Sequence, residues 1–336
     1  MSLPVASHLY LLSPGGILTF FCQSRSQLLG WSACYLLILS TKPTKPLGLR
    51  PPALLSSLFT SHTMICNTIV ISSVLITSAL ACAEHNYHSA GRKRAGETNG
   101  ITWDYDLSHD WGRLSPEFAT CQHGTMQAPI PLRVDQGLAY NHLPNFAGYD
   151  INAAGTMSNW GFGPAMNYAR AEGNFTSLPS FSFEENGKNE SVFLIGWHIH
   201  APSDHTVDGV HSKAEMHLVH ADTAGTPRAV LSIRIAPGNS ASAWFSQIPP
   251  PISFRDVNKT VEASMSPMMA VKEVANFSEF WTYRGSLTTP PCNEGLRFFV
   301  ARQVLYTSVD QMRRILDASK FSSRQIQEVW QHQINV

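Results

Sequence analysis

The chain has 336 residues, of which 43% are hydrophobic and 14% are charged, a composition that suits a globular protein of one or two domains. The 24 basic and 24 acidic residues cancel, but they are spread unevenly, because residues 1–83 contain no Asp or Glu and every acidic residue lies from Glu84 onward. The chain has no basic patch, which argues against nucleic acid as a partner.

The first 83 residues do not have the composition of a folded domain. Within them, MICNTIVISSVLITSALACA (Met64–Ala83) is typical of a secretory signal, since an apolar stretch ends in small residues and Ala81-Cys82-Ala83 forms an A-x-A cleavage site. The flank lacks the usual positive charges, and the competing interpretation is a membrane anchor, because roughly 20 residues suffice to cross a bilayer. The Ser and Thr content favours the signal. We therefore expect a signal peptide at 64–83, an upstream extension or disordered leader at 1–63, and a secreted protein that contacts a membrane only if 64–83 stays uncleaved.

The segment 84–100, EHNYHSAGRKRAGETNG, is polar and contains glycine, which predicts a linker. Lys93-Arg94 within it is either a site for a dibasic-cutting protease, which would make the segment a propeptide, or a solvated charge cluster. The folded domain is expected at 101–336, and this region shows no internal repeat.

Cysteine usage agrees with export. Four of the six cysteines lie before the predicted cleavage point, which leaves Cys121 and Cys292 in the mature chain. Two cysteines in an oxidising compartment form one disulfide or remain as two buried thiols, and their spacing does not decide between these. The domain also carries four N-x-Ser/Thr sequons, which fit a secreted glycoprotein, at Asn174, Asn189, Asn258 and Asn276.

The domain is predicted to consist mostly of strands. Apolar runs rich in Val, Ile and Phe, with Pro and Gly between them, predict four strands, SVFLIGWHIH (191–200), AEMHLVHA (214–221), AVLSIRIA (229–236) and LRFFVARQVL (296–305). One helix is predicted near the C-terminus, where Ser308 and Gln311 form a capping box ahead of MRRIL. A mainly β domain with short peripheral helices follows.

Six of the fourteen histidines lie in one short stretch, GWHIHAPSDHTVDGVHSKAEMHLVHAD (196–222). Side chains alternate along a strand, so His198 and His200 point to the same face. Asp208-Gly209 suits a turn that returns the chain, and His217 on the returning strand can then meet the first two across an antiparallel pair. Three converging neutral imidazoles with no cysteine nearby fit an open tetrahedral Zn2+ site, with water in the fourth position.

Glu215 is on the same face as the third histidine of this set and is placed to accept its other ring N–H. The remaining histidines of the stretch need no metal role, because His220 has the opposite parity, His211 lies in the polar connection and His205 precedes it. The alternative is that all six are hydrogen-bonded and inert histidines of a β-sheet, an alternative that a single His-x-His would favour.

The stretch resembles the α-class carbonic anhydrases, in which a His-x-His strand and a later Glu-x-His-Leu-Val-His strand bind catalytic zinc. TWDYD…HDWGRLSPEFATCQHGTMQAPI resembles the opening of that family, and WTYRGSLTTPPCNEGLRFFV (281–300) resembles its Tyr-x-Gly-Ser-Leu-Thr-Thr-Pro-Pro segment. The resemblance covers 101–324, and the opening motif is carried by Trp103, Tyr105, Trp111, Cys121 and Gln127. It implies a large, twisted, mostly antiparallel central sheet with small helices around it.

The resemblance also implies roles for individual residues. It implies a disulfide between Cys121 and Cys292, zinc ligation by the three histidines, and a Thr288 hydroxyl that accepts the proton of the attacking hydroxide and donates to the carboxylate of Asp204. The apolar wall that would hold CO2 is formed by Val219, Val230, Leu287, Leu296 and Phe298, residues that would otherwise be plain core.

The activity implied is the reversible hydration of CO2 to bicarbonate and a proton. Zinc bound by three neutral imidazoles lowers the pKa of its water to about 7, as in carbonic anhydrase itself, and the resulting hydroxide attacks CO2. Two alternatives remain, a carbonic-anhydrase-like binding protein with little turnover and a zinc-dependent esterase.

The sequence departs from the family pattern at four positions. Asp204 replaces a glutamate that is one methylene longer, Phe298 replaces a tryptophan, and Gly196 stands where a glutamine normally supports the first zinc ligand. In TMSNWGFGPAMNY (156–168), Phe162 falls at the position of the histidine that shuttles protons in fast family members. The identity of a proton shuttle is therefore left unknown by the sequence.

Overall fold

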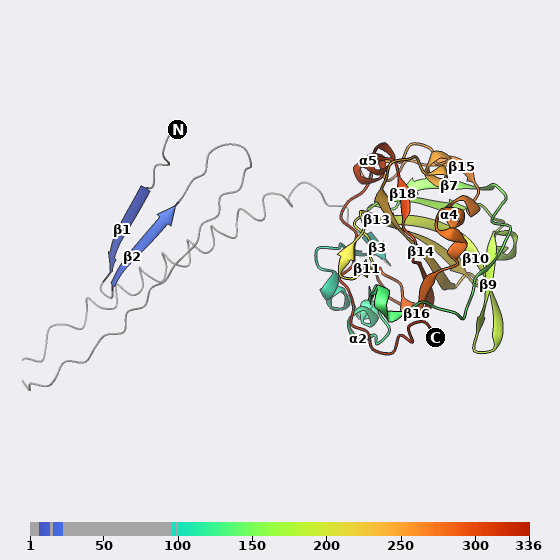
Figure 1. Ribbon diagram of the computed structural model, residues 1–336, viewed down its shortest axis with the longest axis horizontal. Coiled ribbons are helices and arrows are strands. Elements are labelled where there is room, and N and C mark those ends of the chain that lie inside the picture. The colour runs from blue at the N-terminus through green and yellow to red at the C-terminus, as the bar shows by residue number, and fades with distance from the viewer. Residues whose placement is uncertain (1–6, 14–15, 23–95, 99) are drawn as a thin grey trace, which may run out of the picture. The chain divides into compact units, whose positions relative to one another are not determined.

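The computed structural model describes residues 7–13, 16–22, 96–98 and 100–336 (Figure 1). The chain divides into two units, Met1–His85 and Asn86–Val336. In the first unit, strands β1 (Ser7–Ser13) and β2 (Gly16–Cys22) form an antiparallel pair. The predicted signal peptide at 64–83, with its cleavage site, and the dibasic pair Lys93-Arg94 lie outside the described residues.

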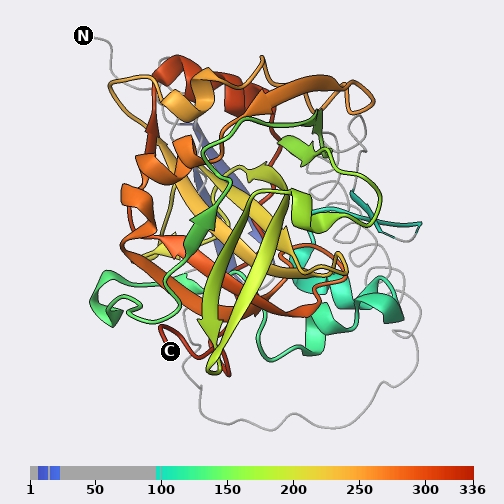
Figure 2. The ribbon, with the colours of Figure 1, turned by 90° about the vertical axis from the view of Figure 1, so that its right-hand side faces the viewer.

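The second unit is built on an 11-stranded sheet with short helices at its periphery (Figure 2). Eight strands follow one another in the order β15-β7-β8-β10-β13-β14-β17-β16, while β9 pairs with β10 and β6, and β18 pairs with β14. Described pairs in this sheet are antiparallel except those of β14 with β17 and β18. The strands are β6 (Asn145–Ala147), β7 (Ala153–Asn159), β8 (Pro164–Tyr168), β9 (Ser180–Glu185), β10 (Lys188–His200), β13 (Ala214–Ala221), β14 (Pro227–Pro237), β15 (Val261–Met265), β16 (Phe280–Ser286), β17 (Glu294–Ala301) and β18 (Leu305–Thr307). The predicted fold class is confirmed.

Smaller elements surround the sheet. Two short sheets contain β3 (Gly96–Thr98) with β4 (Ile101–Trp103), and β12 (Val210–His211) with β11 (Thr206–Val207) and β5 (Pro131–Leu132). The helices are η2 (Ser108–Arg113), η3 (Pro116–Phe118), α2 (Thr120–His123), η4 (Val134–Gln136), η5 (Phe175–Ser177), α3 (Ala243–Ser246), α4 (Met268–Glu273), η6 (Ala275–Phe277) and α5 (Val309–Asp317). Strand β3 lies inside the segment that the sequence assigns to a linker.

Three of the four predicted strands are single strands of the sheet, and the fourth is interrupted. The run 296–305 ends as β17 at Ala301 and resumes as β18 at Leu305; Arg302 N–H still donates across to Glu279 O at 3.0 Å, and β18 then pairs with β14. The predicted capping box is present, with Gln311 N–H donating to Ser308 Oγ at 3.2 Å and the Gln311 side chain accepting from Ser308 N–H at 3.1 Å.

The two faces of the sheet are covered by different apolar clusters. Alternation along β17 sends Phe298 to one face and Phe299 to the other. Phe299 packs in the larger cluster with Phe181 and Phe183, whereas Phe298 packs in a smaller cluster with Val230 and Tyr283. The smaller cluster lies on the face that carries the histidines, since the Phe298 ring is 5.9 Å from that of His217.

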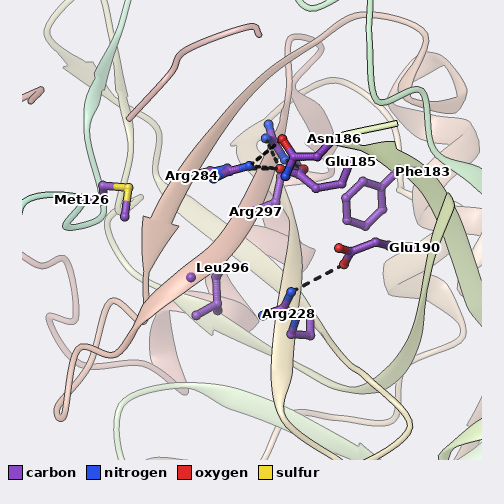
Figure 3. A pocket seen from close by; sticks show the side chains of 10 residues that line it. Met126, Phe183, Glu185, Asn186, Glu190, Arg228, Arg284, Leu296 and Arg297 are labelled. Carbon is purple, nitrogen blue, oxygen red and sulfur yellow. Dashed lines mark hydrogen bonds and ion pairs between the residues drawn. The ribbon is translucent and has the colours of Figure 1, made fainter. Parts of the chain in front are cut away.

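A charged pocket is lined by side chains of β16 and β17 (Figure 3). Arg297 alternates with Phe298 along β17 and therefore points to the face opposite the histidines. Arg284 and Arg297 lie opposite each other on these strands and both bind Glu185 at the end of β9. Arg228 and Glu190 form a further pair at 3.6 Å. The guanidiniums of Arg284 and Arg297, by outweighing the opposite effect of burial, hold the pKa of Glu185 below its usual range.

The N-terminal part of the second unit is joined to the sheet by the disulfide that the family resemblance implies. Cys121 in α2 bonds to Cys292 in the connection between β16 and β17. Around this bond lies a buried aromatic cluster formed by Trp103, Tyr105, Trp111, Phe118 and Phe162. The cluster holds the opening motif of the sequence against the strands that carry the histidines.

Candidate metal centre

Three histidines converge from two paired strands. His198 and His200 lie on β10, and His217 lies opposite His198 on β13. Their ring centroids are separated by 4.9, 5.4 and 4.6 Å, and one nitrogen of each lies within 4.8 Å of one nitrogen of the others. The register of β10 shifts between Leu194 and Gly196, so a bulge precedes the first of these histidines and sets which face it occupies.

Two of the three histidines have a hydrogen-bonding partner for the nitrogen that points away from the convergence. His200 Nδ1–H donates to Ser322 O at 2.7 Å, and His217 Nε2–H donates to Glu215 Oε1 at 2.7 Å. These bonds fix the tautomer of both rings and leave His200 Nε2 and His217 Nδ1 as free lone pairs. His198 has no such partner among the described residues, and its Nε2 lies 3.0 Å from His200 Nε2.

Glu215 organises a wider buried network. Its Oε2 accepts from the N–H of His205 at 2.8 Å, while its Oε1 accepts from His205 Nδ1–H at 2.6 Å and from the Ser232 hydroxyl. The Tyr283 hydroxyl in turn lies 2.7 Å from His205 Nε2. Although burial acts in the opposite direction, His205 and His217 hold the pKa of Glu215 well below its usual range. No role for His205 is predicted from the sequence, because the contact of His205 with Glu215 forms only when the loop folds back onto β13.

Burial favours the neutral form of His198 and His200. Burial, assisted by the proximity of His217, lowers the pKa of His198 to about 3, and burial also lowers the pKa of His200 well below its usual value. Neutral imidazoles are the form that binds metals. His198 Nε2 lies 3.0 Å from the lone pair of His200 Nε2 and donates to it in one tautomer of the His198 ring; in the other tautomer, with the proton on Nδ1, both Nε2 lone pairs are available to one metal ion.

The residues present therefore fit a zinc ion. Three neutral imidazole nitrogens with no thiolate nearby are the donor set of an open tetrahedral zinc site. A second possible group, His205, Glu215 and His217, fits less well because its donor atoms already hydrogen-bond one another.

Asp204 lies beside the histidines with one carboxylate oxygen unmatched. Its Oδ1 accepts from Arg324 N–H at 2.8 Å, whereas Oδ2 has no hydrogen-bond partner among the described residues and lies 3.5 Å from His200 Nε2. Burial, with the charge of Glu215 acting in the same direction, raises the pKa of Asp204 to about 7. The hydroxyl of Thr288 approaches this carboxyl and lowers its pKa, yet the shorter aspartate does not meet it in hydrogen-bonding geometry.

The predicted apolar wall is assembled in part. Val230, Leu296 and Phe298 share the buried cluster on the histidine face, and Leu287 packs against it. Val219 instead lines a cavity of about 420 Å³ that opens beside His198. The structure thus places four of the five residues in one apolar cluster and the fifth in the lining of the cavity.

Phe162 does not line that cavity. Its ring is 2% exposed and stacks on Trp103 with centroids 5.5 Å apart. The neighbouring Trp160 lines the cavity instead, and its ring lies 5.3 Å from both His198 and His200. Sequence reasoning missed Trp160, although Gly161 and Gly163 around it mark a turn that could present an aromatic side chain.

The other singled-out residues lie where the sequence places them. His220 points away from the convergence and hydrogen-bonds the Tyr149 hydroxyl, and His211 is exposed on β12. Asp208 and Gly209 both have positive φ and connect β11 to β12, as a two-residue turn requires. All four sequon asparagines are exposed, namely Asn174, Asn189, Asn258 and Asn276. Within the described residues, every helix is too short or too polar to span a bilayer.

Comparisons with known proteins agree with the geometry. A family model described as eukaryotic-type carbonic anhydrase matches residues 107–334, more than half of the chain. A carbonic anhydrase of Pectobacterium carotovorum is 29% identical over 236 residues, covering 68% of this chain and 85% of the relative. Carbonic anhydrase Nec1 of Nesocodon mauritianus is 27% identical, covering 74% and 88%. Among solved structures, the α-carbonic anhydrase of Thermovibrio ammonificans in complex with sulfanilamide aligns with a TM-score of 0.57 at 24% identity, covering 73% of this chain and 99% of that one.

Proposed function

The chain belongs to the eukaryotic-type carbonic anhydrase family and has the activity of that family; on this premise we propose that it is a zinc enzyme that hydrates CO2 to bicarbonate and a proton at the three-histidine site. The observation that carries the proposal is the convergence of His198, His200 and His217, with one nitrogen of each ring within 4.8 Å of the others and with the outward nitrogens of His200 and His217 hydrogen-bonded to Ser322 O and Glu215. Zinc is the ion that three imidazoles and an open fourth position suit best.

When bound, zinc supplies a Lewis acid that makes a water molecule nucleophilic near neutral pH. The protein holds the ligands through Ser322 O and Glu215, which fix the tautomers of two imidazoles. Thr288 would orient the nucleophile by accepting a hydrogen bond from it, and the Thr288 hydroxyl then needs a hydrogen-bond acceptor for its own O–H. Asp204 is that acceptor in our proposal, reached through a bridging water because its Oδ2 has no direct partner.

The apolar wall completes the site. CO2 has no net dipole, so a surface of apolar side chains beside the nucleophile holds it by displacing water. Val230, Leu296 and Phe298 form such a surface on the histidine face of the sheet, with Leu287 against them. Phe298 is smaller than the tryptophan usual in the family, and we propose a roomier pocket for this chain.

The proposal extends to the segments of the chain outside the metal site. We propose that 64–83 is a signal peptide, that the mature protein is secreted, and that 101–336 is the catalytic domain. The Cys121–Cys292 disulfide and four exposed sequon asparagines support export. N-terminal sequencing of secreted material is expected to begin after Ala83, or after Arg94 if the dibasic site is cut, and a mature protein that retains residue 1 would refute this.

The function is tested by measuring metal content and rate on one preparation. Purified protein should contain one zinc per chain, hydrate CO2, lose activity to a chelator and regain it with zinc. Stoichiometric zinc without CO2 hydration would favour the binding-protein alternative. Ester cleavage without CO2 hydration would favour the esterase alternative, and protein that folds without affinity for zinc would refute the proposed centre.

A further inference from the structure

We propose that Trp160 is a positioning residue that holds His198 and His200 in ligand geometry; the inference rests on the proposed function. The starting observation is the unequal support of the three ligands. Two rings are fixed by Ser322 O and Glu215, and the His198 ring has no equivalent partner among the described residues.

The backbone rules out a partner at the nearest position. Gly196 lies two residues before His198 on the same face of β10, so its side chain would lie alongside the histidine ring. A Cβ at Gly196 would meet Met166 O at 2.5 Å and Asn167 Oδ1 at 3.1 Å, and the former is backbone that cannot give way. The chain is therefore committed to glycine here, and support for His198 must come from elsewhere.

Trp160 supplies this support through two kinds of contact. Its indole N–H donates to Ile199 O at 3.2 Å, the carbonyl between the two ligand residues. Its ring meets the rings of both His198 and His200 at 5.3 Å, with interplanar angles of 65° and 66°. One side chain thus fixes the backbone between the ligands and restricts the rotation of both imidazoles.

Trp160 is itself fixed by the turn that carries it. The backbone N–H of Trp160 donates to Gly163 O at 3.1 Å. Gly161 has a φ of +100°, which glycine adopts readily and which the turn requires. The buried side chain of Asn159 accepts from Gly161 N–H at 2.9 Å and donates to Ile252 O and Ala318 O. Because this turn is anchored to two distant loops, the indole is held in place before any metal binds.

The test measures zinc affinity and the geometry at the metal, which a merely structural residue would not change. Trp160→Phe keeps a ring and removes the N–H, and Trp160→Leu removes both. Removing supporting partners of metal ligands typically weakens metal binding by about 10–100-fold. We expect Trp160→Phe to raise the zinc Kd about 10-fold and Trp160→Leu about 100-fold, with an altered visible spectrum in the Co2+-substituted Trp160→Leu protein.

Trp330→Phe is the matched control, because Trp330 is 64% exposed and its N–H bonds Glu328 at 3.1 Å. Its zinc Kd and Co2+ spectrum should equal those of the wild type. A zinc Kd for both Trp160 variants within twofold of the wild type would overturn the inference and leave the proposed function intact. A wild-type protein without zinc affinity would refute the proposed function itself. If Trp160→Leu does not fold, the Trp160→Phe protein decides alone, by the same Kd criterion.

Discussion

Two polar clusters, one half-buried and one buried, lie on opposite faces of the same sheet, and they differ in whether their charges are paired within the protein. On the β16–β17 face, Glu185 is bound by Arg284 and Arg297, so both carboxylate oxygens have cationic partners (Figure 3). On the β10–β13 face, His198 Nε2 and His200 Nε2 lie 3.0 Å apart, and His200 Nε2 keeps a lone pair because its Nδ1–H donates to Ser322 O. The charges of the first cluster are paired within the protein, whereas the second cluster, in our proposal, binds a cation through its histidine nitrogens. The two clusters therefore differ in whether donor atoms remain available for a ligand.

The largest effect is expected when one proposed metal ligand is removed from the histidine cluster, which we call the open cluster (His198, His200 and His217); the Glu185 cluster with Arg284 and Arg297 is the closed cluster. His217→Ala should abolish stoichiometric zinc and lower the CO2-hydration rate by more than about 100-fold, since losing a ligand exceeds the usual cost of losing a partner of a ligand. His211→Ala, at an exposed histidine of the same stretch, should leave both unchanged. Full zinc and full hydration in His217→Ala would show that the open cluster is not the metal centre.

A second change removes the orienting group while it leaves the ligands in place. Thr288→Val should lower kcat/KM about 100-fold with zinc content unchanged, because a single group that positions or stabilises the reacting atoms is worth about that much. Thr289→Val, at the adjacent half-buried threonine, should have little effect. Equal rates for the two variants would remove Thr288 from the mechanism.

The closed cluster should respond in stability rather than in activity. Glu185→Gln leaves two guanidiniums without a carboxylate, and we expect about 2–3 kcal/mol lower free energy of unfolding, less than for a fully buried pair because the Arg284 side chain is 34% exposed. Glu279→Gln breaks a pair with Arg302 whose side chains are 43% and 40% exposed, and it should cost under about 1 kcal/mol. Zinc content should be normal in both variants.

The pH dependence of the Glu185 effect has a defined sign. The two arginines lower the folded-state pKa of Glu185, against the effect of burial, so its stabilisation is present above the unfolded-state value of about 4.3 and is lost as pH falls through the folded-state pKa. Urea unfolding should therefore separate wild type from Glu185→Gln most at neutral pH and least in acid. A difference that grows below about pH 4 would contradict the assignment.

The smallest expected effect concerns the proton path. Phe162 cannot carry a proton, and its ring is buried against Trp103, so external buffer should take the proton released at the metal site. Turnover at saturating CO2 should rise several-fold with buffer concentration. Phe162→His should leave that dependence in place, because burial disfavours the charged imidazole, and should lower stability by about 1–3 kcal/mol. High wild-type turnover that ignores buffer would show that another group relays the proton.

The sequence by itself determined the elements whose signals are local. Alternation in WHIH and AEMHLVHA placed His198, His200 and His217 on facing strands, and Ser308 with Gln311 marked the start of α5. The family motifs implied the Cys121–Cys292 pair, which no spacing rule could have chosen over free thiols. These features follow from side-chain periodicity and residue type, which act over a few residues.

Only the tertiary structure decided which partners complete the site. Ser322 lies more than a hundred residues after His200 and supplies the hydrogen-bond acceptor for the His200 ring. Trp160 contacts the ligand residues from the turn between β7 and β8. The burial of Phe162 likewise depends on an N-terminal segment that packs over it through Trp103. Contacts between residues distant in the chain depend on how whole strands and loops pack, and no local pattern in the sequence carries that information.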